Sequence, residues 1–271
     1  MLAVKIIVFG ATGMVGQAVL VECLADPAVD EVLVVGRTSV GRREDKLREV
    51  LQPDFLDFAD RADDFTGADG CLFCLGVSSV GMSEADYRRT TKGIALAAAV
   101  LAEVAPESVF GYISGMGTDS TERGRVMWAR VKGETENALL AIPFRAYAVR
   151  PGFIQATDGV RSKTRLYAAI YWVTGWLYPV LRRLAPKYVI RSDELARAMI
   201  ELVRQRPEKR VLESNDLRAA VTGPSVARGP AARQPAFRPP QVSRDRPSAA
   251  RARRAPGRLG IQATRAPDRR R

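Results

Sequence analysis

The chain of 271 residues contains no histidine. This absence excludes His-based catalytic triads, histidine-ligated metals and switches that depend on imidazole protonation near neutral pH. Cysteine is nearly as scarce, because only Cys23, Cys71 and Cys74 occur, each within an apolar run. An odd number of cysteines in apolar surroundings fits a reduced cytoplasmic interior better than a disulfide framework. We therefore expect a cytoplasmic protein with no metal site.

Long unbroken apolar runs are absent as well. The longest candidate, residues 166–181, is uncharged but is interrupted by Gly175 and Pro179. It falls short of the ~20 apolar residues that a membrane-spanning helix needs. Residues 1–9 lack the basic leader and cleavage site of a signal peptide and favour a strand. The aromatic side chains of residues 166–181 leave four roles open: core packing, a lid over a substrate pocket, a dimer face, or contact with a membrane interface.

Charges of the two signs balance in residues 1–217, which hold 28 basic and 28 acidic side chains. The net charge of +12 arises in residues 218–271, which hold 14 arginines, eight prolines, two acidic residues and one aromatic residue. Such a segment buries too little apolar surface to offset its ordering entropy, so we expect a disordered tail. Its composition is that of GC-rich DNA read in an unselected frame, and we hypothesise a frameshift or read-through product without function. The alternative is an arm that binds nucleic acid through phosphate contacts.

Short runs rich in Val and Ile alternate with helical patterns through the first 150 residues. This alternation predicts an α/β fold with a doubly wound parallel sheet and helices on both faces. Nearly continuous apolar runs indicate strands that are covered on both sides. A capping box at residues 83–86 predicts a helix to about residue 99, and a second helix is predicted over residues 126–140. The predicted strands are Val4–Phe9, Glu31–Val35, Glu49–Leu51, Cys71–Leu75, Val109–Ser114 and Ala146–Val149.

The alternation ends after residue 149. Residues 166–184 and 192–203 have helical patterns, and Ser192-Asp193-Glu194 is a helix-start signal for the second of them. We expect these helices to form a small C-terminal cap, at about residues 153–215, over one end of the sheet. The predicted organisation is therefore one domain over residues 1–217, including the cap, followed by a disordered basic tail at residues 218–271.

The strongest motif is a Gly-x-x-Gly-x-x-Gly string at Gly10, Gly13 and Gly16, between a predicted strand and a predicted helix. This context is typical of a Rossmann-type dinucleotide site. We predict that Gly10 permits a tight turn, that Gly13 lets the backbone approach a pyrophosphate, and that Gly16 lets the helix pack closely on the strand. The N–H groups of the first helical turn are expected to bind the phosphates. They belong to Thr12, Met14 and Val15.

The end of the second predicted strand indicates which nicotinamide dinucleotide binds. NAD sites usually place an acid there for the ribose 2′-OH, whereas NADP sites place a basic residue for the 2′-phosphate. This chain has Arg37 at the tip and no acid, which predicts NADP(H). Asp54 and Phe55 after the third strand are predicted to lie near the adenine. Leu75 and Gly76 after the fourth are predicted to pass the middle of the cofactor.

Together with Pro151 and Gly152 after the last predicted strand, these motifs make the chain resemble the short-chain dehydrogenase/reductase superfamily. The resemblance spans about residues 3–215. Within the superfamily, the chain looks most like the atypical branch, which holds Tat-interacting-protein-like oxidoreductases and bacterial NAD(P)-binding, epimerase-like proteins. It implies that Pro151 and Gly152 contact the cofactor, and it makes a homodimer plausible. Its most specific pieces are GATGMVG at residues 10–16, CLG at 74–76, SGMGTD at 114–119 and VKGETE at 131–136.

Members of this superfamily carry a serine after the fifth strand and a Tyr-x-x-x-Lys pair on the next helix. The tyrosine exchanges the proton, the lysine lowers the tyrosine pKa and holds the nicotinamide ribose, and the serine orients the substrate oxygen. Ser114 and Lys132 match the serine and the lysine, but the tyrosine position is Trp128. An indole N–H donates a hydrogen bond and does not exchange a proton near neutral pH. The resemblance therefore implies a catalytic set of Ser114, Lys132 and, in place of the tyrosine, Trp128.

Three functions follow from these features. The first is an NADP-dependent oxidoreductase for an unknown small carbonyl or alcohol, with its proton from Ser114, Tyr112, Tyr147 or ordered water. The second is a non-catalytic module that senses NADPH and signals to a regulatory protein partner. The third is a nucleic-acid or membrane-surface protein that uses the Arg-rich tail and the aromatic segment. A body of zero net charge gives the third no further electrostatic support.

Overall fold

The computed structural model describes residues 4–55, 61–93, 95, 99, 103–142, 144–157 and 188–222. The aromatic segment at residues 166–181 and the Arg-rich residues 223–271 lie outside the described residues. The roles suggested for both segments therefore stay predictions.

A parallel sheet of seven strands forms the centre of the described part, in the order β3-β2-β1-β4-β5-β6-β9. The strands are β1 (Val4–Phe9), β2 (Val29–Gly36), β3 (Leu47–Leu51), β4 (Gly70–Phe73), β5 (Val109–Ile113), β6 (Arg145–Arg150) and β9 (Val211–Glu213). The chain builds outward from β1 to β3, then returns through β4 and continues in the other direction. Ligands of such doubly wound sheets bind beyond the carboxyl ends of the strands, where the order reverses.

Strand β1 lies at this reversal point, and its continuous apolar sequence suits a strand that is buried on both faces. Alternate residues of a strand point to opposite faces, so a strand covered on both sides needs apolar residues at every position. Ile6 and Val8 belong to the core on one face, whereas Ile7 and Phe9 belong to the core on the other, and all four are almost fully buried. All six strands predicted from the sequence are confirmed, with ends that shift by at most two residues.

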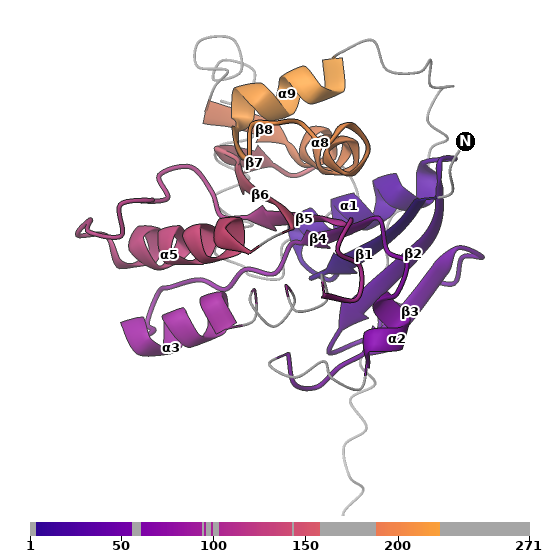
Figure 1. Cartoon of the computed structure of the whole chain (residues 1–271), viewed down its shortest axis with the longest axis horizontal. Helices are drawn as coiled ribbons and strands as arrows, with labels where there is room; N and C mark the ends of the chain where they lie inside the picture. The colour runs from indigo at the N-terminus through magenta and orange to yellow at the C-terminus, as the bar shows by residue number, and fades with distance from the viewer. Residues whose placement is uncertain are drawn as a thin grey trace, which may run out of the picture. The chain divides into compact units, whose positions relative to one another are not determined.

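Helices cover both faces of the sheet (Figure 1). One face carries α1 (Met14–Ala25) and α8 (Ser192–Gln205), with α9 (Ser214–Thr222) packed against α8. The other face carries α5 (Met127–Ala141) beside α3 (Glu84–Arg88), which continues as a π-helical turn, η2 (Arg89–Gly93). Short elements complete the described part: α2 (Ala62–Phe65), and a separate parallel pair of β7 (Phe153–Gln155) with β8 (Val189–Arg191).

The C-terminal part differs from the predicted cap in three ways. Helix α8 packs beside α1 on the sheet, with Ala196 and Met199 fully buried, because its wide apolar face needs a layer to cover. Strand β9, only three residues long, adds a seventh strand beside β6 that the sequence pattern does not reveal. Helix α9 continues to Thr222, so residues 218–222 belong to the fold and not to the tail. Arg218 donates a hydrogen bond to the carbonyl of Val189.

Candidate functional site

The glycine-rich turn joins β1 to α1 at the carboxyl edge of the sheet. Gly10 has φ +79°, a left-handed conformation that glycine adopts without strain, and its carbonyl accepts the N–H of Gly13 at 2.8 Å. A Cβ on Gly16 would lie 2.1 Å from the Gly10 oxygen, so only glycine lets the helix approach the turn this closely. Gly13 itself is exposed. The turn has the shape that the motif predicts, with a bare backbone at its outer side.

The first turn of α1 leaves backbone donors available. No side chain caps this helix, and its first turn holds no acidic residue. The N–H groups of Met14, Val15 and Gly16 belong to the first turn, where no intrahelical acceptor exists. Met14 and Val15 are half-buried and Gly16 is buried, but the partial positive charge of this helix end beside the exposed Gly13 suits an anionic group. This part of the chain fits the phosphates of a dinucleotide.

A cavity of about 370 Å³ lies along the same edge of the sheet. This volume is in the usual range of small-molecule sites, about 300–1,000 Å³. Six residues predicted from the sequence to bind the cofactor come together in its wall. They are Arg37, Asp54, Phe55, Leu75, Gly76 and Lys132. The remaining lining residues are Pro53, Phe73, Val77, Asp86, Tyr87, Arg89, Thr90, Thr91 and Tyr112.

Arg37 follows directly on β2 and is exposed. Within the described part of the chain its guanidinium makes no ion pair, in contrast to Arg88, Arg130 and Arg150. A charge that faces a cavity without a partner is available to an anion. The tip of β2 therefore supplies one unpaired cation to the wall.

Lys132 is held in place on α5. Its Nζ donates a short hydrogen bond to the backbone carbonyl of Ser114 at the end of β5. Burial lowers the pKa of Lys132, and the carboxylate of Glu136, one turn further along the helix, opposes that shift. The lysine thus reaches the cavity from α5 with its ammonium directed at the end of β5.

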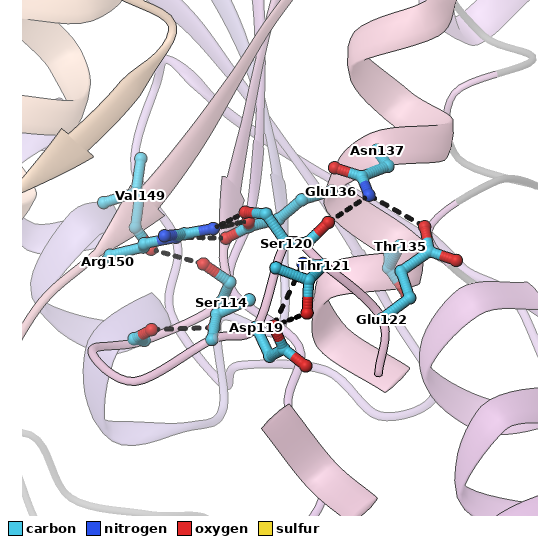
Figure 2. A network of polar contacts seen from close by, with 12 residues as sticks. Ser114, Asp119, Ser120, Thr121, Glu122, Thr135, Glu136, Asn137, Val149 and Arg150 are labelled. Carbon is cyan, nitrogen blue, oxygen red and sulfur yellow. Dashed lines mark hydrogen bonds and ion pairs between the residues drawn. The ribbon is translucent and has the colours of Figure 1, made fainter. Parts of the chain in front are cut away.

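The structure does not bring Ser114 into the cavity wall. Its side chain is 1% exposed, and its hydroxyl donates to the carbonyl of Val149 at 3.2 Å. The N–H of Ser114 binds the same carbonyl at 2.9 Å. Figure 2 shows Ser114 turned toward β6. In this arrangement the hydroxyl joins two strand ends and is engaged before any substrate arrives.

Two other predicted cofactor contacts, Pro151 and Gly152, also serve the protein's own backbone. The carbonyl of Pro151 accepts the N–H of Met116 at 2.8 Å, and the N–H of Gly152 donates to the hydroxyl of Ser214 at 2.9 Å. Neither residue is among the described residues that line the cavity. The glycine turn is not among them either, so the cavity accounts for only part of a dinucleotide site.

Trp128 lies one helical turn before Lys132, where the superfamily has its tyrosine. Its side chain is half-buried, and the Lys132 ammonium is 6.0 Å from the centre of its ring. The Cη2 atom is within 3.5 Å of the place that a Cβ on Gly117 would take, so the indole packs against the loop after β5. Trp128 therefore packs between α5 and this loop, and it is not among the described residues that line the cavity.

The hydroxyls of Tyr112 and Tyr147, the two tyrosines predicted as alternative proton donors, have different surroundings. The Tyr147 hydroxyl donates to the carbonyl of Pro207 at 2.8 Å, at the amino end of the sheet. Tyr112 lines the cavity together with Lys132, and its buried hydroxyl makes no hydrogen bond with the described residues. Burial raises the pKa of Tyr112 well above its usual range, so this hydroxyl is neutral and able to donate. Of the two, Tyr112 is the one placed to meet a ligand.

A buried ion pair anchors the loops around Lys132 (Figure 2). Glu136 of α5 is 1% exposed and accepts three hydrogen bonds from the Arg150 guanidinium, two of them from Nε at 3.0 and 3.2 Å and the third from Nη2. The same guanidinium also donates to the hydroxyl of Ser120. Sequence reasoning missed this pair because nothing in the spacing of Glu136 and Arg150 indicates contact. It joins α5, the end of β6 and the loop after β5.

Sequence reasoning also missed the wall that α3 and η2 provide. Five residues of these elements line the cavity: Asp86, Tyr87, Arg89, Thr90 and Thr91. The capping box did contain a usable signal, since the Ser83 hydroxyl accepts the N–H of Asp86 at 3.1 Å and fixes the helix start. A helix that begins soon after β4 must place its first turns near the carboxyl edge of the sheet. That inference locates the wall but not which side chains face the ligand.

Comparisons with known proteins agree with this geometry. No protein-family model matches the chain. Protein HTATIP2 of Rattus norvegicus is 25% identical over 187 residues, which cover 65% of this chain and 76% of that protein. The mitochondrial protein fmp52-1 of Aspergillus oryzae is 28% identical over 199 residues, covering 70% of this chain and 82% of the relative.

Solved structures share the fold at lower identity. A UDP-N-acetylglucosamine 4-epimerase from Methanobrevibacter ruminantium M1 superposes with a TM-score of 0.58 and 16% identity, over 78% of this chain and 76% of the epimerase. The dTDP-glucose 4,6-dehydratase DesIV from Streptomyces venezuelae, solved with NAD and TYD bound, gives 0.54 and 15% identity over 73% and 71%. The two relatives confirm the predicted resemblance to the Tat-interacting-protein-like branch, and the solved structures confirm the Rossmann-type fold.

Among the described helices, none has the length and apolar character needed to cross a membrane. The cytoplasmic location predicted from the sequence stays a prediction, and the name of the fungal relative assigns that protein to mitochondria.

Proposed function

We propose that this chain, a relative of the Tat-interacting-protein-like branch of the short-chain dehydrogenase/reductase superfamily, is an NADP(H)-binding oxidoreductase for a small carbonyl or alcohol. The fold and its relatives support a nicotinamide dinucleotide. The choice of NADP(H) rests on one observation: Arg37, unpaired among the described residues, lines the cavity at the tip of β2. A guanidinium there suits a phosphate, whereas a 2′-OH would call for an acid.

The chain's own groups divide the work of binding. The bare backbone around Gly13 and the first turn of α1 fit the pyrophosphate. Asp54 and Phe55 give the adenine end one polar and one apolar wall, and Lys132 marks the nicotinamide end. When bound, the cofactor supplies or accepts the hydride, which leaves the protein to orient the substrate and move a proton.

The proton donor is where this chain departs from the superfamily. Trp128 exchanges no proton, the Ser114 hydroxyl is bound to Val149, and the Tyr147 hydroxyl is bound to Pro207. Tyr112 lines the cavity together with Lys132, and its buried hydroxyl makes no hydrogen bond with the described residues. We assign it the role of hydrogen-bond donor to a substrate oxygen, with the Lys132 ammonium offsetting negative charge that develops there.

A second candidate function is an NADPH-sensing module without turnover. The observation that favours it is the state of the superfamily's catalytic set, since Trp128 replaces the tyrosine and Ser114 is engaged with the backbone. In this case the cofactor would bind tightly and a regulatory protein partner would read the bound state. The two functions share a binding site and differ in whether the bound cofactor is consumed.

A titration of the full chain tests the proposal. NADPH and NADH are added separately, and binding is followed by quenching of tryptophan emission and by energy transfer to the nicotinamide. We expect NADPH to bind at least tenfold more tightly than NADH, and Arg37→Ala to abolish that difference, because one hydrogen bond to a charged group contributes about 1.5–3 kcal/mol. Arg145→Ala is the matched control, since Arg145 is an exposed arginine at the amino end of β6.

The outcomes separate the alternatives. Equal affinity for the two cofactors in the unaltered chain would overturn the NADP(H) assignment, and no binding of either would overturn the function. With NADPH binding established, absorbance at the nicotinamide band is followed with a panel of small aldehydes and ketones. Oxidation of NADPH supports the oxidoreductase. Tight binding without oxidation across the panel supports the sensor.

A further inference from the structure

The cavity has two arginines in its wall, contributed by different elements. Arg37 comes from the tip of β2, and Arg89 is the first residue of η2, on the helical wall. Both side chains are exposed, and neither makes an ion pair within the described part of the chain. The glycine motif and the strand ends predict a cofactor-binding function for Arg37, but they assign no function to Arg89.

The nearby arginines of α3 and α5 are paired with carboxylates. Arg88 binds Glu134 at 2.7 and 2.8 Å and Glu84 at 2.7 Å, and Arg130 binds the other oxygen of Glu84 at 2.6 Å. These contacts hold the pKa of Glu134 and that of Glu84 below the usual range, as expected for engaged carboxylates. Glu84 and Glu134 are thus committed to Arg88 and Arg130. Arg89, next in sequence, faces the cavity instead.

Charge in the cavity favours an anion. Its wall holds the cations Arg37, Arg89 and Lys132 and the carboxylates Asp54 and Asp86. Asp86 accepts a hydrogen bond from the Ser83 hydroxyl at 2.6 Å, as part of the helix cap. A phosphate monoester carries about −1.5 to −2 charges at neutral pH. Beside two carboxylates a single guanidinium offsets only part of that charge, and the second guanidinium offsets more of it.

We propose that Arg89 is a second specificity-determining residue, which binds the 2′-phosphate of NADP(H) together with Arg37. This inference rests on the proposed function, since it requires that the cavity take the 2′-phosphorylated cofactor. Thr90 and Thr91, which follow Arg89 in η2, line the same wall. Two planar guanidinium groups from different elements would together offer a tetrahedral anion several hydrogen bonds.

The test uses the full chain and four variants: Arg37→Gln, Arg89→Gln, Arg89→Lys and, as the control for loss of one charge, Arg145→Gln. Dissociation constants are measured for NADPH, NADH, and adenosine 2′,5′-bisphosphate against adenosine 5′-monophosphate. We expect Arg89→Gln to weaken NADPH and the bisphosphate about tenfold or more and to change NADH and the monophosphate less than about twofold. Arg89→Lys should recover part of the lost affinity, because lysine keeps the positive charge but lacks the planar guanidinium that binds phosphate with two hydrogen bonds. Arg145→Gln should leave all four affinities unchanged.

Each contrary result has its own meaning. If Arg89→Gln weakens NADPH and NADH equally, Arg89 acts on the shared part of the cofactor or on the fold, and the inference is overturned. If Arg89→Gln changes nothing while Arg37→Gln removes the NADPH preference, the proposed function stands and the inference fails. If the unaltered chain binds neither nucleotide, the proposed function fails first. Circular dichroism and a urea titration of each variant show whether it folds as the unaltered chain does.

Discussion

The carboxylate of Glu136 and the guanidinium of Arg150 form an ion pair in the interior, with the glutamate side chain fully buried and the arginine side chain 14% exposed. Arg150 ends β6, immediately before the Pro151–Gly152 turn, and Glu136 lies one turn after Lys132 on α5. The pair therefore ties the helix that carries Lys132 to the end of β6, and the contact of Arg150 with Ser120 adds the loop after β5. The mutual attraction of the two charges contributes little net stability to the fold. Removing one partner is costly, because the other charge is then buried without a counter-charge.

Glu136→Gln should lower the free energy of unfolding by about 3 kcal/mol, because it leaves the Arg150 guanidinium without a counter-charge. Urea denaturation measures the change. Lys209→Gln is the control at a solvent-exposed pair with Asp216, where the lysine side chain is 61% exposed, and about 0.5 kcal/mol or less is expected. The double variant Glu136→Met with Arg150→Met should recover much of the loss. A double variant as unstable as the single one would show that shape, and not the unpaired charge, is the cause.

Gly16→Ala and Gly76→Ala should separate stability from binding. A Cβ at position 16 would press on the Gly10 carbonyl at 2.1 Å, so we expect a loss of about 1–3 kcal/mol in unfolding free energy and weaker nucleotide binding. A Cβ at position 76 meets nothing within 4 Å, yet Gly76 lines the cavity. Gly76→Ala should leave urea stability unchanged within about 1 kcal/mol and weaken NADPH binding. Unchanged binding in Gly76→Ala would remove Gly76 from the cofactor site.

Trp128→Tyr restores the superfamily's hydroxyl one helical turn before Lys132. If the chain is an oxidoreductase, the rate of NADPH oxidation with small carbonyls should rise, within the 10²–10⁴-fold that general acid–base catalysis contributes. The pH profile should also gain a group that titrates in the alkaline range. Trp128→Phe removes the indole without adding a hydroxyl and serves as the control. A rate and pH profile identical in all three proteins would show that position 128 does not border the reacting atoms.

Tyr112→Phe and Tyr147→Phe form a matched pair. The first removes a buried hydroxyl that has no hydrogen-bond partner among the described residues, so the unfolding free energy should stay equal or rise. The second removes the bond to the Pro207 carbonyl and should cost about 1 kcal/mol. If Tyr112 donates to the substrate, only Tyr112→Phe should slow NADPH oxidation while leaving NADPH affinity intact. Slowing by Tyr147→Phe alone would reverse that assignment.

The ion pairs of α3 and α5 predict how stability depends on acid. Hydrogen bonds from Arg88 hold the pKa of Glu134 below its usual value of 4.5. A carboxyl with a depressed pKa in the folded state stabilises the fold above its unfolded pKa, and this contribution is lost as the pH falls through the folded pKa. Urea midpoints should therefore fall as the pH is lowered below about 4.5, and less steeply in Glu134→Gln. The exposed Glu107→Gln is the control. An equal slope in Glu134→Gln would exclude this pair as a source of the acid sensitivity.

The sequence by itself determined the framework of this protein. Apolar runs such as Ile6 to Phe9 can only be covered on both faces, which sets a parallel sheet, and the spacing of Gly10 to Gly16 sets the turn, because a Cβ at position 16 has no room. Local rules suffice for such features, since each depends on residues close in the chain. The position of Arg37 at a strand end follows in the same way.

Only the tertiary structure decided which side chains share a wall. The contacts of Glu136 with Arg150, of the Ser114 hydroxyl with Val149, and of α8 with α1 join residues far apart in sequence. Arg89 enters the cavity because η2 follows α3 across the carboxyl edge, and Arg88 does not because Glu84 and Glu134 bind it. Adjacent residues on a helix point in different directions, so the three-dimensional packing chooses between them. The periodicity of the sequence predicts the helix, but the tertiary contacts of each side chain determine what that side chain does.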